Sequence, residues 1–133
     1  MDPSKPEDWL RFVRFPALTR DWERFGLGDA DLRALEAAIL KDPTRAPIVR
    51  GTGGLRKLRF VEPGAPRGKS GAFRVCYAVF PEFGTVALVV VFGKKEKESL
   101  TTADRNAVAA VIRAYRAEVE QEFRRGQGQE GGA

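Results

Sequence analysis

The sequence feature that most constrains the fold is an unbroken apolar run, Val86 to Phe92. The run is far shorter than the ~20 residues that cross a bilayer as a helix. A continuous apolar segment of this length is typical of a strand buried on both faces of a sheet. Phe73 to Phe80 predicts a second strand, and Glu82-Phe83-Gly84 between the two predicts a hairpin turn. We therefore expect this hairpin to form the centre of a sheet.

The other segments predict two more strands and three helices. The strands are Trp9 to Phe15 and Leu55 to Val61, and the helices are capped by Thr19, Asp29 and Thr101. The first helix runs to Phe25, and the second ends at Asp42-Pro43. In the third helix, Asp104 completes a capping-box-like start, and the apolar stripe is Val108, Val111, Ile112, Tyr115 and Val119. The fold class is α+β: a twisted, mainly antiparallel sheet, two N-terminal helices and one C-terminal helix.

Size and composition narrow the class of protein further. The 133 residues, 43% of them hydrophobic, fit a single domain, assigned to residues 9–125 between a flexible N-terminus (1–8) and a disordered tail (126–133). The chain has one cysteine, Cys76, and no histidine, which excludes a disulfide framework, a Cys/His zinc site and an imidazole base. We expect a cytoplasmic protein without metal or cofactor, with no membrane association, and with Cys76 packed as a small side chain.

The positive charge is concentrated in one segment. From Arg50 to Arg74 there are seven Lys/Arg and the single acid Glu62, whereas the rest of the chain carries 16 basic and 17 acidic residues. Because side chains alternate along a strand, Lys57 and Arg59 are expected on one face and Leu58 and Phe60 on the other. Such a local cationic face favours a polyanion, RNA or DNA. The alternative is that these cations are solvated or paired with acids.

Clustered cations also suit RNA cleavage. Attack by the 2′-OH of RNA on the adjacent phosphate needs a proton acceptor, positive groups around the phosphate and a proton donor for the 5′ oxygen. Lysine and arginine supply all of these except a conventional base. Crowding of like charges makes a lysine a better proton acceptor, and Lys57 or Lys94 is the candidate base.

Several motifs together resemble the RelE/HigB toxins of bacterial type II toxin-antitoxin systems, closest to the HigB-like branch. The motifs are Gly51-Thr52-Gly53-Gly54-Leu55-Arg56-Lys57-Leu58-Arg59, Gly68-Lys69-Ser70-Gly71, Arg74-Val75-Cys76-Tyr77 and Phe92-Gly93-Lys94-Lys95-Glu96. The resemblance spans Leu10 to Glu118. It departs from the HigB pattern at Ala72 and at Cys76-Tyr77-Ala78.

The resemblance implies a RelE-like fold and a ribosome-dependent mRNA endonuclease that acts in the ribosomal A site. It also implies a cognate antitoxin of helix-turn-helix type, with operator DNA contacted only through the toxin-antitoxin complex. Carried over by motif, the catalytic positions are Lys57, Arg59, Arg74, Lys94 and Lys95. Arg56, Arg67 and Lys69 are assigned to RNA or ribosome binding. The alternatives are a ParE-like gyrase inhibitor and a catalytically silent RNA-binding or co-repressor relative.

Overall fold

The computed structural model describes residues 11–64, 72–93 and 100–131, with side chains to residue 126. Its elements, in chain order, are β1 (Arg11–Arg14), α2 (Pro16–Arg24), α3 (Asp29–Lys41), β2 (Arg56–Phe60), β3 (Phe73–Phe80), the 3-10 turn η1 (Pro81–Phe83), β4 (Thr85–Gly93) and α4 (Thr102–Gly131). The strands form one sheet in the order β1-β4-β3-β2. β1 is parallel to β4 and the other two pairings are antiparallel. The predicted α+β class is confirmed.

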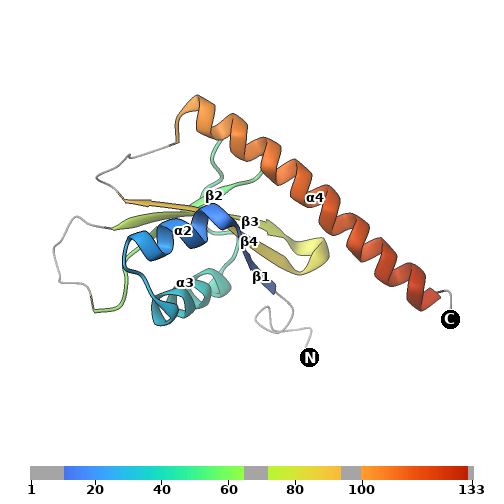
Figure 1. Ribbon diagram of the computed structural model, residues 1–133, viewed down its shortest axis with the longest axis horizontal. Helices are drawn as coiled ribbons and strands as arrows, with labels where there is room; N and C mark the ends of the chain where they lie inside the picture. The colour runs from blue at the N-terminus through green and yellow to red at the C-terminus, as the bar shows by residue number, and fades with distance from the viewer. Residues whose placement is uncertain (1–10, 65–71, 94–99, 132–133) are drawn as a thin grey trace.

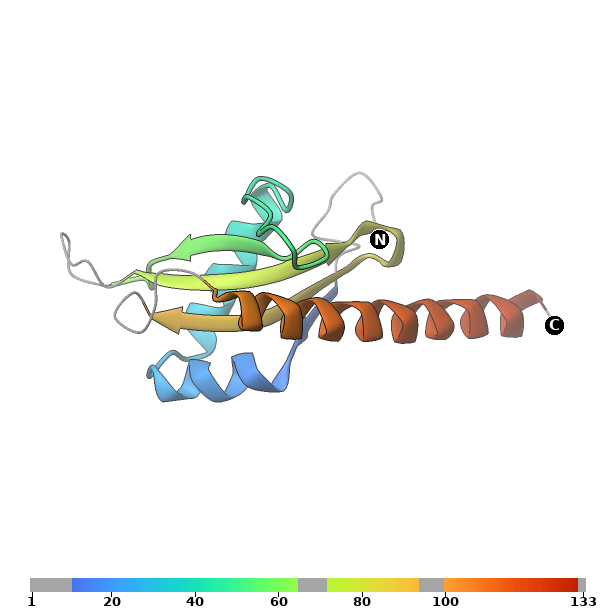
Figure 2. The ribbon, with the colours of Figure 1, turned by 90° about the horizontal axis from the view of Figure 1, so that it is seen from above.

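Helices cover both faces of the sheet (Figures 1 and 2). α2 and α3 pack on one face through a core that includes Leu18, Leu35 and Ile39. α4 packs on the opposite face through a second core that includes Val108 and Ile112. Successive side chains of β3 enter the two cores alternately. The first core takes Val75 and Tyr77, and the second takes Cys76 and Ala78.

The apolar run predicted as the central strand lies in β4, between β1 and β3. Val86, Ala87 and Leu88 have no solvent exposure. Because both of its faces and both of its edges are covered, a polar side chain at these positions would be buried without a hydration shell. The predicted turn before β4 is present as η1, which ends at Gly84 with a left-handed φ of 57°.

Two helix starts were predicted wrongly. Thr19 lies inside α2, which begins at Pro16 after the N-cap Phe15, because proline's fixed φ suits the first position of a helix. Asp29 is the first residue of α3 and not its cap. Gly28 takes the cap position, and its N–H donates to the Asp31 carboxylate at 2.8 Å. The predicted caps Thr19 and Asp29 were therefore four residues and one residue late.

The start of α4 matches the prediction. The Thr101 N–H donates to the Asp104 carboxylate and the Asp104 N–H donates to the Thr101 hydroxyl, both at 3.1 Å. Val108, Ile112 and Val119 of the predicted stripe are buried, but Val111 is 46% exposed. The helix also continues to Gly131, where the sequence predicted disorder from residue 126. No proline interrupts residues 102–131, so the backbone hydrogen-bond pattern is not blocked there.

Across the described residues, no helix is both long and apolar enough to cross a bilayer. The same residues contain no group of three or more side chains arranged to hold a metal ion.

Candidate nucleic-acid interface

A glycine turn positions the basic strand β2. Gly51, Gly53 and Gly54 have φ values of 80°, 76° and 116°, a region that other residues adopt only with strain. Between them, the buried Thr52 hydroxyl donates to the Val49 carbonyl at 2.6 Å and accepts from the Leu55 N–H at 3.0 Å. These hydrogen bonds of Thr52 hold the turn in place, and the turn determines where β2 begins.

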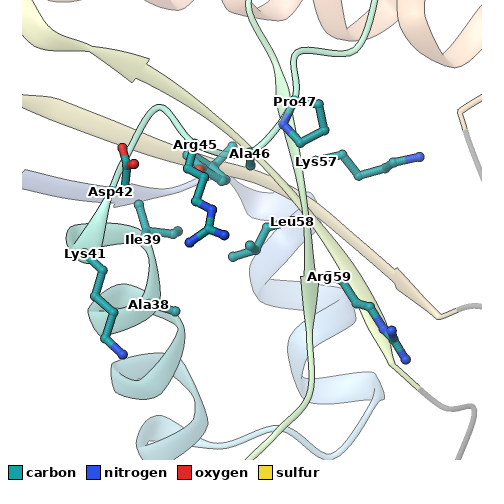
Figure 3. Close-up of a pocket in the computed structure, with 11 residues that line it drawn as sticks. Ala38, Ile39, Lys41, Asp42, Arg45, Ala46, Pro47, Lys57, Leu58 and Arg59 are labelled. Carbon is teal, nitrogen blue, oxygen red and sulfur yellow. The ribbon is translucent and has the colours of Figure 1, made fainter.

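The faces of β2 follow the predicted alternation. Leu58 and Phe60 pack in the core beneath α2 and α3, and Lys57 and Arg59 extend to the other side of the strand (Figure 3). Arg59 is exposed and Lys57 is half-buried. The predicted register of β2 is confirmed.

The strand register brings two arginines together. Arg59 lies directly opposite Arg74 in the β2–β3 ladder, and Lys57 lies opposite Cys76 on the same face. Directly opposed residues have Cβ atoms about 4.5–5.5 Å apart, and like charges in this arrangement are destabilising. We call Lys57, Arg59 and Arg74 the cationic cluster.

The cationic cluster has no acidic partner among the residues that the structure describes. The ion pairs found there lie elsewhere: Arg20–Asp21, Arg24–Asp21, Arg116–Glu82 and Arg124–Glu120. Glu62 is the single acid of the basic segment, and one of its carboxylate oxygens is buried without a hydrogen bond. One guanidinium nitrogen of Arg74 is also buried without a hydrogen bond. One alternative from the sequence was that acids pair with these cations. The described residues do not show such pairs.

The structure does not bring Arg56 to the cationic cluster. Its side chain lies on the opposite face of β2 and donates to the Thr44 and Ala46 carbonyls at 2.8 and 2.7 Å. Arg56 thereby fixes the segment after α3 against the strand.

The remaining positions assigned from the sequence are Arg67, Lys69, Lys94 and Lys95, and these lie outside the described residues. Gly93, which precedes Lys94, pairs with Phe73 next to Arg74.

The face of the sheet beside the cationic cluster is covered by α4. Cys76 and Ala78 are buried in the core that contains Leu55 and Ile112, so the small side chains on this face of β3 serve as packing for α4. Arg59 and Arg74 therefore lie at the end of the β2–β3 ladder, and Lys57 lies opposite the packed Cys76. Cys76 is packed, as predicted.

A second feature, not anticipated from the sequence, lies on the other side of β2. A cavity of about 460 Å³ opens between the end of α3 and the outer edge of β2. Its lining consists of Ala38, Ile39, Lys41, Asp42, Arg45, Ala46, Pro47, Lys57, Leu58, Arg59 and Tyr77. Figure 3 shows Leu58 and Arg45 directed into the space between helix and strand. Lys41 and Arg45 flank Asp42-Pro43, and only the fold reveals that both line a cavity beside β2.

Tyr77 also lines this cavity, and its hydroxyl donates to the Pro43 carbonyl at 2.9 Å. Burial raises the pKa of the Tyr77 phenol above its usual value of 10, and Arg56 opposes this rise. A raised folded-state pKa gives stability that is present below pH 10 and lost as the pH rises through the folded value. We expect Tyr77→Phe to cost about 1 kcal/mol at neutral pH and to flatten the loss of stability above pH 10. Urea unfolding at pH 7 and at pH 10.5 measures both effects, and an identical alkaline loss in both proteins would contradict this role.

No protein-family model matches the chain. Among solved structures, a chain of the intact E. coli RelBE toxin-antitoxin complex is 20% identical with a TM-score of 0.46, over 62% of this chain and 93% of that one. A double-arginine mutant of E. coli RelE in the free state is 19% identical with a TM-score of 0.47, over 78% and 96%. The isolated E. coli RelE toxin is 20% identical with a TM-score of 0.46, over 77% and 98%. At this distance the likeness assigns no function, which has to rest on the site itself.

Proposed function

We propose that this chain is the toxin of a toxin-antitoxin pair, a RelE/HigB-type endoribonuclease that cleaves translated mRNA on the ribosome. The observation that carries the proposal is the cationic cluster, in which Arg59 faces Arg74 across two strands with Lys57 beside them. No carboxylate among the described residues neutralises this cluster. Two arginines at directly opposed strand positions form an arrangement that an anion stabilises.

Phosphate is the anion that suits this geometry. Guanidinium groups bind phosphate oxygens through paired, charge-assisted hydrogen bonds. The repulsion between Arg59 and Arg74 is relieved when a phosphodiester lies between them. A polynucleotide, which carries a phosphate at every residue, is thus favoured over an isolated carboxylate.

The cationic cluster is suited to cleavage as well as to binding. The 2′ oxygen attacks the adjacent phosphorus, a 2′,3′-cyclic phosphate forms, and the bond to the 5′ oxygen of the next nucleotide breaks. Arg59 and Arg74 stabilise the negative charge that develops on the non-bridging oxygens. Lys57, on the same face, is the acceptor of the 2′-OH proton, and the departing 5′ oxygen is protonated by a neighbouring cation or by water.

The wider biological setting is part of the same proposal. The sequence motifs that resemble RelE/HigB toxins support mRNA on the ribosome as the substrate, the cytoplasm as the location and a helix-turn-helix antitoxin as the partner. A basic surface of this kind is complementary to an acidic antitoxin segment, and such an interaction weakens as salt is added.

Expression in bacteria tests this function directly. Induction of the chain is expected to arrest growth and to produce discrete transcript ends inside translated codons, mapped by primer extension. The double variant Lys57→Ala/Arg59→Ala should abolish both effects, whereas Arg33→Ala, an exposed arginine on α3, should retain them. Growth arrest without transcript cuts would point to a gyrase inhibitor. The absence of both effects with a folded protein would point to a silent RNA-binding relative.

A further inference from the structure

We propose that the cavity between α3 and the outer edge of β2 is a nucleotide pocket that holds one base of the bound RNA. This inference rests on the proposed function for its ligand class, since it places the base next to a phosphate held by the cationic cluster. The cavity is separated from that cluster only by β2 itself, because Lys57 and Arg59 contribute to its rim while their charged ends lie on the far side of the strand (Figure 3).

The cavity has the size and the floor that a base requires. Its volume of about 460 Å³ falls within the roughly 300–1,000 Å³ typical of small-molecule sites. Ile39, Ala46 and Leu58 give it an apolar floor, and Ile39 is only 1% exposed. A flat heteroaromatic ring can cover this floor, and the Arg45 guanidinium, which lies over the same space (Figure 3), can stack on its face.

The edge of β2 supplies polar groups that can pair with a base. The Val49 N–H donates to the Leu55 carbonyl at 2.7 Å, and the Lys57 N–H donates to the Pro47 carbonyl at 3.0 Å. Residues 47–49 thus cover the first part of this edge. Strand alternation turns the N–H and C=O of Arg59 outward on the same edge, where no backbone group of the described residues bonds them. One donor and one acceptor side by side match the hydrogen-bonding edge of a nucleobase.

The same edge argues against a protein strand as the occupant. An added strand gains affinity from a row of backbone hydrogen bonds, but within β2 this side offers only the Lys57 carbonyl and the N–H and C=O of Arg59. A single nucleotide needs no more than the two groups of Arg59. The short free edge therefore favours a base over an extended peptide.

The charged side chains around the cavity also favour a nucleic acid as the ligand. Lys41 and Arg45 lie on the α3 side, Lys57 and Arg59 lie on the β2 side, and Asp42 is the one acid of the lining. An RNA strand that crosses the edge of β2 can therefore place a phosphate on either side of the base. Cations are present on both sides of the cavity to bind these two phosphates.

The test uses short RNA that cannot be cleaved. A 5′-phosphorylated trinucleotide with 2′-O-methyl riboses is titrated calorimetrically into the full chain, together with a matched trinucleotide whose central residue is abasic. Base stacking and pairing predict about tenfold weaker binding of the abasic RNA.

The variant Ala38→Leu places an aliphatic branch in the cavity. It should weaken binding of the parent RNA by the same factor and leave binding of the abasic RNA unchanged. Ala37→Leu, the neighbouring exposed position outside the cavity, is the matched control and should bind like the parent.

The outcomes separate the possible occupants. Equal affinities for the parent and abasic RNA, no detectable binding of either, or no effect of Ala38→Leu would overturn the proposal. A hexaglutamate peptide is titrated in parallel, and if Ala38→Leu weakens the peptide but not the RNA, the cavity belongs to an acidic protein segment. Because the RNA cannot be cut, these results do not depend on whether the chain cleaves RNA. Failure of the pocket is thereby distinguished from failure of the proposed function.

Discussion

Replacing Arg74 by alanine is expected to lower the rate of RNA cleavage by more than tenfold while the protein stays folded. The reason is electrostatic, because Arg74 lies between Arg59 and Phe92 on the sheet and can stabilise charge on the phosphate in the transition state. A loss of about 1.4 kcal/mol of transition-state stabilisation already gives a factor of ten. The fold should survive, since Val75 and Tyr77 of the first core point to the opposite face.

Single-turnover cleavage of mRNA at saturating protein measures this effect, with circular dichroism as the check on folding. Arg33→Ala removes an equivalent charge from the exposed surface of α3 and should cleave at the parental rate. If folded Arg74→Ala also cleaves at that rate, Arg74 belongs to a binding surface only and has no part in the chemistry.

Reversing the charge at Arg59 is expected to separate stability from function. Arg59→Glu places a carboxylate directly opposite Arg74, so a repulsive cross-strand pair becomes an attractive one. Such pairs contribute roughly 0.2–1 kcal/mol, and we expect the free energy of unfolding to rise by about this amount. RNA binding should collapse, because the carboxylate repels the phosphate and occupies the guanidinium of Arg74.

Urea unfolding and RNA titrations over a range of salt concentrations give the two readouts for this variant. The neutral variant Arg59→Gln is the control, and it should lose about one phosphate contact, which corresponds to a change of about 0.7 in the salt slope for single-stranded RNA. An Arg59→Glu protein that is less stable than the parent, or that binds RNA as tightly, would contradict the account of opposed arginines.

Much of the fold could be predicted from local sequence, because its signals are periodic. The apolar run of β4 identified the central strand, and the period of two in β2 placed Leu58 inside and Arg59 outside. The Thr101–Asp104 capping box located the start of α4. The starts of α2 and α3 were predicted wrongly because their N-cap residues, Phe15 and Gly28, have no polar side chain that marks a cap in the sequence.

The candidate site was less accessible from sequence, since it depends on which residues the fold places side by side. The pairing of Arg59 with Arg74 follows from the register of β2 on β3, which composition does not specify. Arg56 was assigned to RNA or ribosome binding, yet it lies on the opposite face of the strand from Lys57 and donates to the Thr44 and Ala46 carbonyls. The cavity beside Arg45 has no local signal, because its two walls are distant in the chain.

The most direct test of the central claim is a cleavage reaction with purified protein and ribosomes programmed with a defined mRNA. The account predicts a single cut in the codon that occupies the A site, with a 2′,3′-cyclic phosphate on the upstream fragment and no cut by Lys57→Ala/Arg59→Ala. Intact mRNA after incubation with saturating, folded protein that arrests growth in cells would contradict it.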